Sequence, residues 1–244
     1  VVSKTMIEKR PRLLVPDLST FGVHDQAVVS FSSSSEIGVP RFALLVDGAF
    51  LIKKIERKNG HFPSVDEIKS ICSNIGSLPE LSGFTLFRTY FYHAHPAKGD
   101  LINPIDKSRL NLGSSSIYRA HHQLITGLEM APSFAMRLGE IAVRDWKIGA
   151  KAMKSLLQTP RQIQAHDLVP NIEQKGVDRI GLDVAKLSLQ RLVDAVVIVT
   201  GDSDLIPVLK FARREGLQVF LCSLDHMVRR DLKIHADRLL KVAI

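Results

Sequence analysis

The chain has 244 residues, and its 33 Lys and Arg against 25 Asp and Glu give a net charge of +8. Hydrophobic residues make up 45% of the sequence and charged residues 24%, which is ordinary for a globular protein. These proportions exclude a wholly disordered chain, a collagen and a disulfide-rich scaffold. No apolar run approaches the roughly 20 residues that cross a bilayer, so we expect no membrane segment. The positive charge favours a polyanionic partner.

The first forty residues differ from the rest in composition and lack a regular hydrophobic pattern. Pro11, Pro16 and the serines of 32–35 interrupt every periodic pattern. We therefore predict that residues 1–40 form a poorly ordered extension, or order only against a partner. Residues 41–244 then form the folded domain. The N-terminus shows no secretory pattern, and a cytoplasmic location is expected.

Strand-like and helix-like segments alternate along the folded part. Four stretches predict strands: Phe42–Val46, Phe84–Tyr92, Ala195–Val199 and Leu217–Cys222. The first and third are continuously apolar, and the second is rich in aromatic residues and Thr. Helical spacing follows Phe50 and again Leu205, the second helix with Ser203 or Asp204 as its cap. Such alternation predicts an α/β protein with a mostly parallel sheet covered by helices on both faces. The two cysteines, Cys72 and Cys222, lie in apolar stretches and are expected to be buried, reduced thiols.

Residues 96–165 fit this alternation poorly, and we interpret them as an insertion that carries substrate-specific features. Within it, residues 115–130 favour a helix, and residues 134–143 favour a strand that leads into a Lys-rich helix. The lysines of that helix, Lys147, Lys151 and Lys154, and a second basic cluster at residues 53–58 are either solvated helix faces or contacts for phosphates.

Acidic residues follow two of the predicted strands. Asp47 comes directly after Phe42–Val46, and Asp202 and Asp204 come after Ala195–Val199. Asp178 precedes a helix that runs through Leu182 and Leu189, from which it can reach the same place. In an open α/β sheet, ligands bind beyond the carboxyl ends of the strands. The sequence therefore predicts that these four acids share one edge of the sheet.

Close carboxylates need a cation. Two unit charges about 4 Å apart repel by on the order of 4 kcal/mol at an effective dielectric constant of about 20. A hard metal such as Mg²⁺ takes oxygen ligands and relieves this repulsion. The alternative is structural, because Asp47, Asp178, Asp202 and Asp204 each stand where a helix cap or a turn residue is common.

Three motifs resemble those of the NYN domain family of the PIN-like nuclease superfamily: Val46-Asp47-Gly48, Lys175-Gly176-Val177-Asp178 and Thr200-Gly201-Asp202-Ser203-Asp204. The resemblance covers roughly residues 42–241. It implies a Rossmann-like three-layer α/β/α sandwich and an endoribonuclease that hydrolyses RNA with Mg²⁺ or Mn²⁺.

The resemblance also implies roles for residues. Asp47, Asp178, Asp202 and Asp204 correspond to the catalytic, metal-binding acids, and we expect Lys175 and Ser203 to contact the substrate. Asp183 lies about 140° around its helix from Asp178, so we place it outside the direct metal site. Family members usually carry Asn at the position of Phe50, which puts full catalytic competence in question.

Other interpretations stay open. A catalytically weak RNA-binding or regulatory module is consistent with Phe50 and with the insertion. An aspartyl-phosphate phosphatase would use Asp202 and Asp204 as nucleophile and acid. The histidines at positions 93, 95, 121 and 122 fit no ordinary zinc spacing and are interpreted as scattered polar or core residues. A second copy or another protein is a candidate partner for the extension or the insertion.

Overall fold

The computed structural model describes residues 38–175, 179–224 and 227–242. The predicted extension therefore lies outside the described residues, except for its last three. Within these ranges no helix is both long and apolar enough to cross a bilayer.

A seven-stranded sheet forms the centre of the fold, in the order β6-β5-β2-β1-β7-β8-β9. Its strands are β1 (Arg41–Asp47), β2 (Thr85–Ala94), β5 (Phe134–Ile148), β6 (Leu168–Lys175), β7 (Ala195–Val199), β8 (Gln218–Cys222) and β9 (Arg238–Leu240). All neighbouring pairs are parallel except β5 with β6. A separate hairpin joins β3 (Asp100–Ile102) to β4 (Arg109–Asn111).

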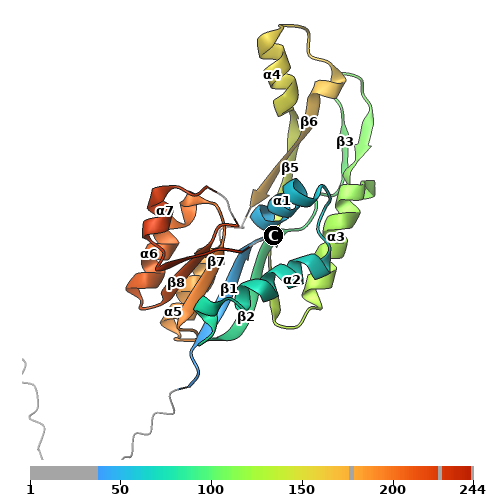
Figure 1. Ribbon diagram of the computed structural model, residues 1–244. Coiled ribbons are helices and arrows are strands. Elements are labelled where there is room, and N and C mark those ends of the chain that lie inside the picture. The colour runs from blue at the N-terminus through green and yellow to red at the C-terminus, as the bar shows by residue number, and fades with distance from the viewer. Residues whose placement is uncertain (1–37, 176–178, 225–226, 243–244) are drawn as a thin grey trace, which may run out of the picture. The chain divides into compact units, whose positions relative to one another are not determined.

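Helices cover both faces of this sheet (Figure 1). The helices of the described residues are α1 (Gly48–Asn59), α2 (Val65–Gly76), α3 (Ser116–Glu129), α4 (Ala150–Gln158), α5 (Ile180–Leu189), α6 (Ile206–Arg214) and α7 (Arg230–Ile234). Of these, α4 lies away from the two faces of the sheet. Side chains of α1, α2 and α3 pack on one face, and side chains of α5, α6 and α7 pack on the other. The mostly parallel α/β/α sandwich predicted from the sequence is confirmed.

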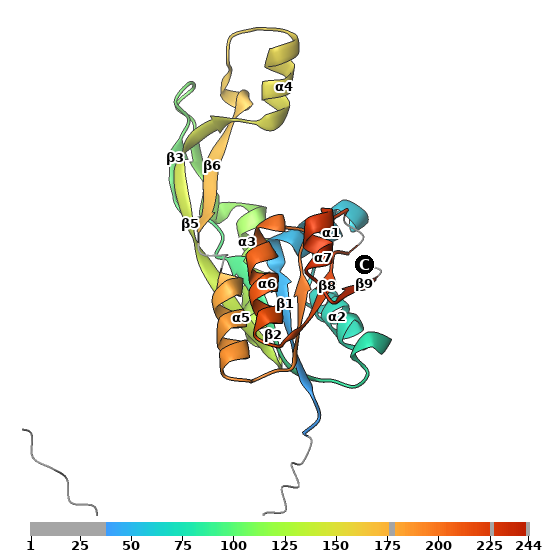
Figure 2. The same ribbon diagram turned by 90° about the vertical axis from the view of Figure 1, so that its left-hand side faces the viewer.

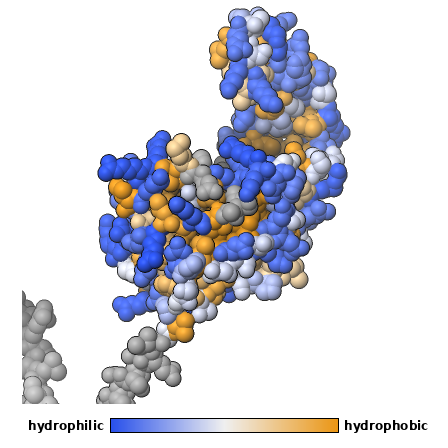
Figure 3. Space-filling view, viewed as in Figure 1, coloured by the Kyte–Doolittle hydropathy of each residue, from blue (hydrophilic) through white to orange (hydrophobic). Residues whose placement is uncertain are grey.

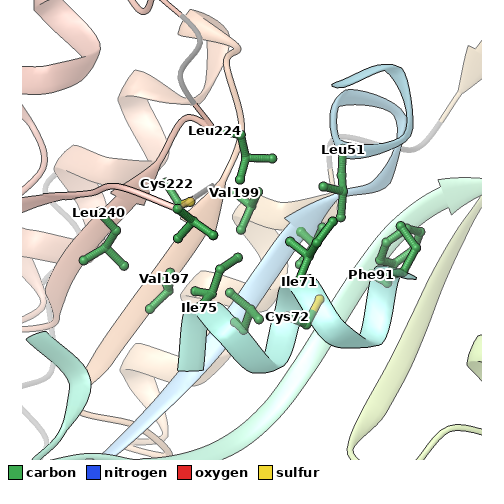
Figure 4. Close-up of a cluster of buried hydrophobic side chains, with 14 of the residues drawn as sticks. Leu51, Ile71, Cys72, Ile75, Phe91, Val197, Val199, Cys222, Leu224 and Leu240 are labelled. Atoms are coloured by element: carbon green, nitrogen blue, oxygen red, sulfur yellow. The ribbon is translucent and has the colours of Figure 1, made fainter. Parts of the chain in front are cut away.

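The strands at the centre are apolar because both of their faces are covered. All five residues of β7 are buried, and alternate residues of β1 enter the two opposite cores. Figure 4 shows one of these cores, in which Cys72 and Cys222 lie among aliphatic side chains. Both thiols are buried without a disulfide, as predicted, and burial raises the pKa of Cys72 to about 12.

The four predicted strands are present within two residues of their expected bounds, and two helices differ in detail. The helix after β7 is preceded by a short 3₁₀ turn, η5 (Ser203–Leu205), whose N-cap is Asp202 rather than Ser203 or Asp204. In α5 the expected residues Leu182 and Leu189 are exposed, and Ile180, Val184 and Leu187 face the core instead.

The region 96–165 contributes both to the sheet and to a projection from it. The first residues of β5, Phe134–Gly139, pair with β2. Beyond Gly139 the same strand pairs with β6 from Glu140 to Ile148. These nine residues carry β5 about 30 Å past the end of β2. Residues 140–175, with α4 between the two strands, form a projection that we call the arm (Figure 2).

The arm is tied to the β3–β4 hairpin and to itself by specific bonds. Trp146 Nε1 donates to the carbonyl of Ile102 at 2.9 Å. Arg161 donates two hydrogen bonds, of 2.6 and 2.7 Å, to the buried carboxylate of Asp167, and this pairing holds the pKa of Asp167 well below its usual range. No residue of α4 is buried. Hydrophilic residues cover most of the visible surface of the arm tip (Figure 3).

Candidate metal centre

The strand order changes direction next to β1. From β1 the chain proceeds to β2 and β5 on one side, and later to β7, β8 and β9 on the other. Such a switch point opens a crevice beyond the carboxyl ends of the two central strands, where open α/β sheets bind ligands. Val46 pairs with Val199, so Asp47 and Thr200 lie at the same level above that edge.

Asp47 ends β1 and caps α1. Its Oδ1 accepts a hydrogen bond from the Phe50 N–H at 3.0 Å. Gly48 follows because helix and sheet approach closely there: a Cβ at this position would lie 2.5 Å from Phe91 Cε1 and 2.7 Å from the Tyr92 carbonyl oxygen. The Asp-Gly pair is therefore a packed strand-to-helix junction, and it fixes the direction of the Asp47 carboxylate.

Thr200 connects Asp47 to the loop after β7. Its Oγ1 accepts from the Asp202 N–H at 3.1 Å and lies 3.4 Å from Asp47 Oδ2, to which it donates. Asp202 Oδ1 in turn accepts from the Asp204 N–H at 2.9 Å. Thr200 stands within the third motif of the sequence, but no role was predicted for it. Only the register of β1 and β7 shows that its hydroxyl reaches both acids.

Within the described residues, the acids of the site carry negative charge that no basic side chain pairs with. Burial raises the pKa of Asp47 above its ordinary value, and the nearby Asp202 carboxylate raises it further, against the lowering effect of the Phe50 N–H. Within residues 38–175, 179–224 and 227–242, no Lys, Arg or His forms an ion pair with Asp47, Asp202 or Asp204. Each cap uses one carboxylate oxygen, Oδ1 in both Asp47 and Asp202.

Of the other predicted site residues, some lie among the described residues and some do not. Asp204 and Ser203 lie in η5 beside Asp202, and the side chain of Asp204 is exposed. Asp178 lies outside the described residues, as does the side chain of Lys175 at the end of β6. Among the residues that are described, no three Asp, Glu, His or Cys side chains gather closely enough to hold a metal ion.

Asp183 is occupied elsewhere, consistent with its placement outside the direct metal site. Its carboxylate accepts from Arg137 Nε at 2.7 Å and from Arg137 Nη2 at 3.2 Å, and Tyr92 Oη donates to it at 2.8 Å. Arg137 comes from β5 and Tyr92 from β2. This acid therefore fastens α5 to two strands.

Phe50 stands on α1 where the related family carries Asn. Its backbone N–H donates to the capping carboxylate of Asp47, its ring packs against the apolar core, and Lys54 Nζ lies 5.7 Å from the ring centre. The backbone contact to Asp47 is available to any residue at this position. What Phe50 removes is a polar side chain near the acids.

Two histidines that the sequence analysis treated as scattered are in direct contact. His93 Nε2 lies 3.0 Å from His121 Nδ1, and the two rings stack with an interplanar angle of 14°. His93 Nδ1 is buried without a hydrogen-bond partner among the described residues. Burial, with His121 and His95 nearby, lowers the pKa of His93 to about 4, so His93 is neutral at pH 7. Their separation of 28 residues gave no signal in the sequence.

Comparison with known proteins agrees with the motifs. Residues 134–243 match the model of the NYN domain family, a family of nuclease type. This match covers β5 to the C-terminal part of the sheet, just under half of the chain, and begins after the first motif at Asp47. It confirms the resemblance to the NYN family over these residues.

A crystal structure of a protein of unknown function from Vibrio parahaemolyticus superposes on this chain with a TM-score of 0.46 at 14% identity. The superposition covers 83% of this chain and 93% of that one. No match to a curated protein was found.

Proposed function

We propose that this chain is a metal-dependent endoribonuclease that hydrolyses RNA, with Asp47, Asp178, Asp202 and Asp204 as its metal-binding and catalytic acids. The observation that supports this most directly is the meeting of Asp47 and Asp202 at the switch point of the sheet. Thr200 Oγ1 donates to the Asp47 carboxylate and accepts from the Asp202 backbone N–H. Burial and the Asp202 charge both raise the pKa of Asp47.

The residues at this position suit a hard divalent cation. Carboxylate oxygens are the ligands that Mg²⁺ and Mn²⁺ prefer. Capping through Oδ1 orients the Asp47 and Asp202 carboxylates. A cation would also relieve charge that no basic side chain of the described residues offsets. The role of Asp47 and Asp202 as helix caps is therefore compatible with metal binding by either acid.

A bound Mg²⁺ or Mn²⁺ supplies Lewis acidity, which activates water and neutralises charge on the phosphate. The protein's own part is to hold Asp47 and Asp202 in fixed directions through the helix cap and Thr200. Lys175 and Ser203 are assigned to contacts with the phosphate of the substrate. The basic clusters hold the RNA backbone, and residues 1–40 and the region 96–165 are available to a second copy or a protein partner. We assign the activity of the domain, residues 41–244, to the cytoplasm.

The experiment compares RNA cleavage by the wild type and by Asp202→Asn in Mg²⁺ and in Mn²⁺. We expect kcat/KM to fall at least about 100-fold in Asp202→Asn. Asp66→Asn, which changes an acid with a side chain 90% exposed on α2, is the matched control and should cleave normally. Intact RNA after incubation with the wild type in either metal would contradict the proposal, and so would full activity of Asp202→Asn.

A second candidate function is favoured by Phe50. The apolar ring beside Asp47 is compatible with a module that binds RNA and cleaves it poorly. RNA binding that is independent of metal, unchanged in Asp47→Ala and accompanied by no cleavage would identify this module.

A further inference from the structure

A cavity of about 380 Å³ lies at the foot of the arm, away from the acids. Its walls come from the end of β2, the β3–β4 hairpin, α3 and the two strands of the arm, β5 and β6. They are mostly apolar: Ala94, Pro96, Leu110, Ile141, Pro170 and Ile172. This volume is in the range of small-molecule sites.

The cavity belongs to the same edge of the sheet as Asp47. Tyr92 on β2 pairs with Asp47 on β1, and Ala94, which lines the cavity, lies two residues further along β2. Ile141 lies two residues beyond Gly139, the last β5 residue that pairs with β2. An extended ligand that crosses the acids in the direction of β5 therefore reaches the cavity.

Two aromatic side chains give the cavity its polar groups. Tyr118 and His121 are three residues apart on α3, so both lie on the same face of the helix. The Tyr118 hydroxyl has no hydrogen-bond partner within the described part of the chain. His121 uses Nδ1 toward His93, which leaves Nε2 for a ligand. The third polar side chain, Ser115, already donates to the Leu112 carbonyl at 2.7 Å and accepts from the Tyr118 N–H at 3.0 Å.

A cation accompanies these rings, and no acidic side chain lines the cavity. Lys98 Nζ lies 5.9 Å from the centre of the Tyr118 ring. Through His121 and Ile172 the cavity also adjoins a second pocket, of about 410 Å³, which Lys53 and Ala49 of α1 help to line. Ala49 lies in the first turn of α1, the helix that Asp47 caps, so this second pocket extends from the cavity toward the start of α1.

Apolar walls, two hydrogen-bonding rings and a neighbouring ammonium group suit a planar heterocycle that carries a phosphate. An acyl chain or an aliphatic side chain would use the walls alone and leave the polar groups unused. Proteins that bind single-stranded RNA commonly hold splayed bases against Tyr and His rings in this way.

We propose that this cavity binds one unstacked nucleobase of a single-stranded RNA whose backbone passes Asp47 and Asp202, with Tyr118 and His121 against the base and Lys98 toward a phosphate. The direction of the strand rests on the proposed nuclease function, whereas base binding itself does not.

The experiment measures binding of AMP, GMP, CMP, UMP and ribose 5-phosphate to the full chain by calorimetry, without metal. Ribose 5-phosphate keeps the phosphate and lacks the base. We expect at least one nucleotide to bind about tenfold more tightly than ribose 5-phosphate, a difference typical of one stacked base. Ile141→Trp, which fills the cavity, and Tyr118→Ala, which removes one ring, should each abolish this difference.

Leu86→Trp is the matched control, because it adds the same ring to a different cavity, of about 710 Å³ and bounded by α2. It should leave the preference for nucleotides unchanged, and thermal melting of each variant checks its folding. If Ile141→Trp does not fold, Tyr118→Ala decides alone.

Equal binding of the nucleotides and ribose 5-phosphate would overturn the proposal. So would a preference that survives both Ile141→Trp and Tyr118→Ala, or binding of decanoate in place of every nucleotide. RNA cleavage, assayed separately with Mg²⁺ and Mn²⁺, keeps the two proposals apart. Base binding without cleavage would contradict the nuclease proposal and support the base-binding cavity. Cleavage without base binding would support the nuclease proposal and contradict the base-binding cavity.

Discussion

Thr200 Oγ1 lies 3.4 Å from Asp47 Oδ2, and this contact joins the ends of two neighbouring parallel strands. Thr200 is fully buried, and its hydroxyl also accepts from the N–H of Asp202. One side chain therefore positions both acids of the proposed metal centre without itself being charged.

Replacement of this hydroxyl should weaken the binding of metal. In Thr200→Val, Asp47 loses a hydrogen bond that lowers its pKa, so its carboxylate is harder to ionise. We expect the affinity for Mn²⁺, measured by calorimetry at pH 7, to fall about 10- to 100-fold, as for other residues that orient metal ligands. The pH midpoint of Mn²⁺ binding should rise at the same time.

Thr200→Ser keeps the hydroxyl and should bind Mn²⁺ nearly as the wild type does. Equal Mn²⁺ affinity in Thr200→Val and the wild type would show that the hydroxyl has no part in positioning the acids.

The acids should cost the fold some stability. Burial raises the pKa of Asp47, so the folded state disfavours its charged form at neutral pH. Asp47→Asn keeps a good helix cap and removes that charge. We expect its free energy of unfolding at pH 7 and its Tm to increase relative to the wild type, while RNA cleavage is lost.

The sign of this effect follows from proton linkage. A carboxyl whose pKa is higher in the folded state becomes more favourable to folding as the pH falls. The advantage of Asp47→Asn should therefore shrink toward the ordinary Asp pKa of 3.8. Asp66→Asn serves as the control and should match the wild type in urea unfolding at pH 7 and near the ordinary Asp pKa. If Asp47→Asn is less stable than the wild type at pH 7, burial of the charged Asp47 does not cost the fold stability.

His93 should make the protein sensitive to acid. Its pKa is about 4 in the folded state, below the ordinary value of 6.5, so only the unfolded chain takes up this proton between those values. Stability from this group is present above pH 6.5 and is lost as the pH falls toward 4, by on the order of 3 kcal/mol in full.

Urea unfolding between pH 7 and pH 4 measures this loss. His93→Leu does not titrate and should show a flatter dependence on pH than the wild type. His61→Gln removes a histidine whose side chain is 57% exposed, and should follow the wild type. The same slope in His93→Leu and the wild type would rule out His93 as its source.

The ion pair between Arg137 and Asp183 should matter for stability and little for metal binding. Asp183→Ala leaves a partly buried guanidinium and the Tyr92 hydroxyl without their acceptor, and we expect a loss of about 2–3 kcal/mol. Tyr92→Phe removes one hydrogen bond and should cost about 1 kcal/mol. Urea unfolding of both variants and of the double variant gives the coupling between them.

We also expect Tyr92→Phe to bind Mn²⁺ with the same affinity as the wild type. A loss of Mn²⁺ binding comparable to that of Asp202→Asn would instead place Asp183 and its partners in the metal centre.

The sequence was sufficient to locate the central strands and the acids that follow them. Buried parallel strands such as Ala195–Val199 are continuously apolar, and the carboxyl edge is defined by chain direction alone. Contacts between distant segments were not accessible in this way. The stacking of His93 on His121 and the pairing of Arg137 with Asp183 depend on which strands become neighbours, and no local pattern encodes that.

The arm illustrates the same limit. Its strand and its Lys-rich helix were predicted from local patterns, but its length was not, because the point at which β5 leaves β2 and pairs with β6 depends on the fold of β6. That β5 continues beyond the carboxyl edge places the arm on the side of the sheet where the substrate is expected.

Three lysines of the arm should contribute to binding of RNA. The two arginines of its strands and loop, Arg144 and Arg161, are paired with Glu173 and Asp167, whereas Lys147, Lys151 and Lys154 form no ion pair within the described residues. Each phosphate contact on a single strand contributes about −0.7 to the slope of log K against log salt. Replacement of all three lysines by Ala should therefore make that slope shallower by about 2.

Trp146 provides the measurement, because it is the single tryptophan of the chain and lies on β5 within the arm. Titration of the wild type with a single-stranded RNA should change its fluorescence, and repeating the titration at several salt concentrations gives the slope. Alanine at Lys210, Lys233 and Lys241, three exposed lysines outside the arm, changes the net charge equally. If that control variant loses as much of the slope as the arm variant, the effect belongs to net charge, because only a local contact makes the position of the three lysines matter.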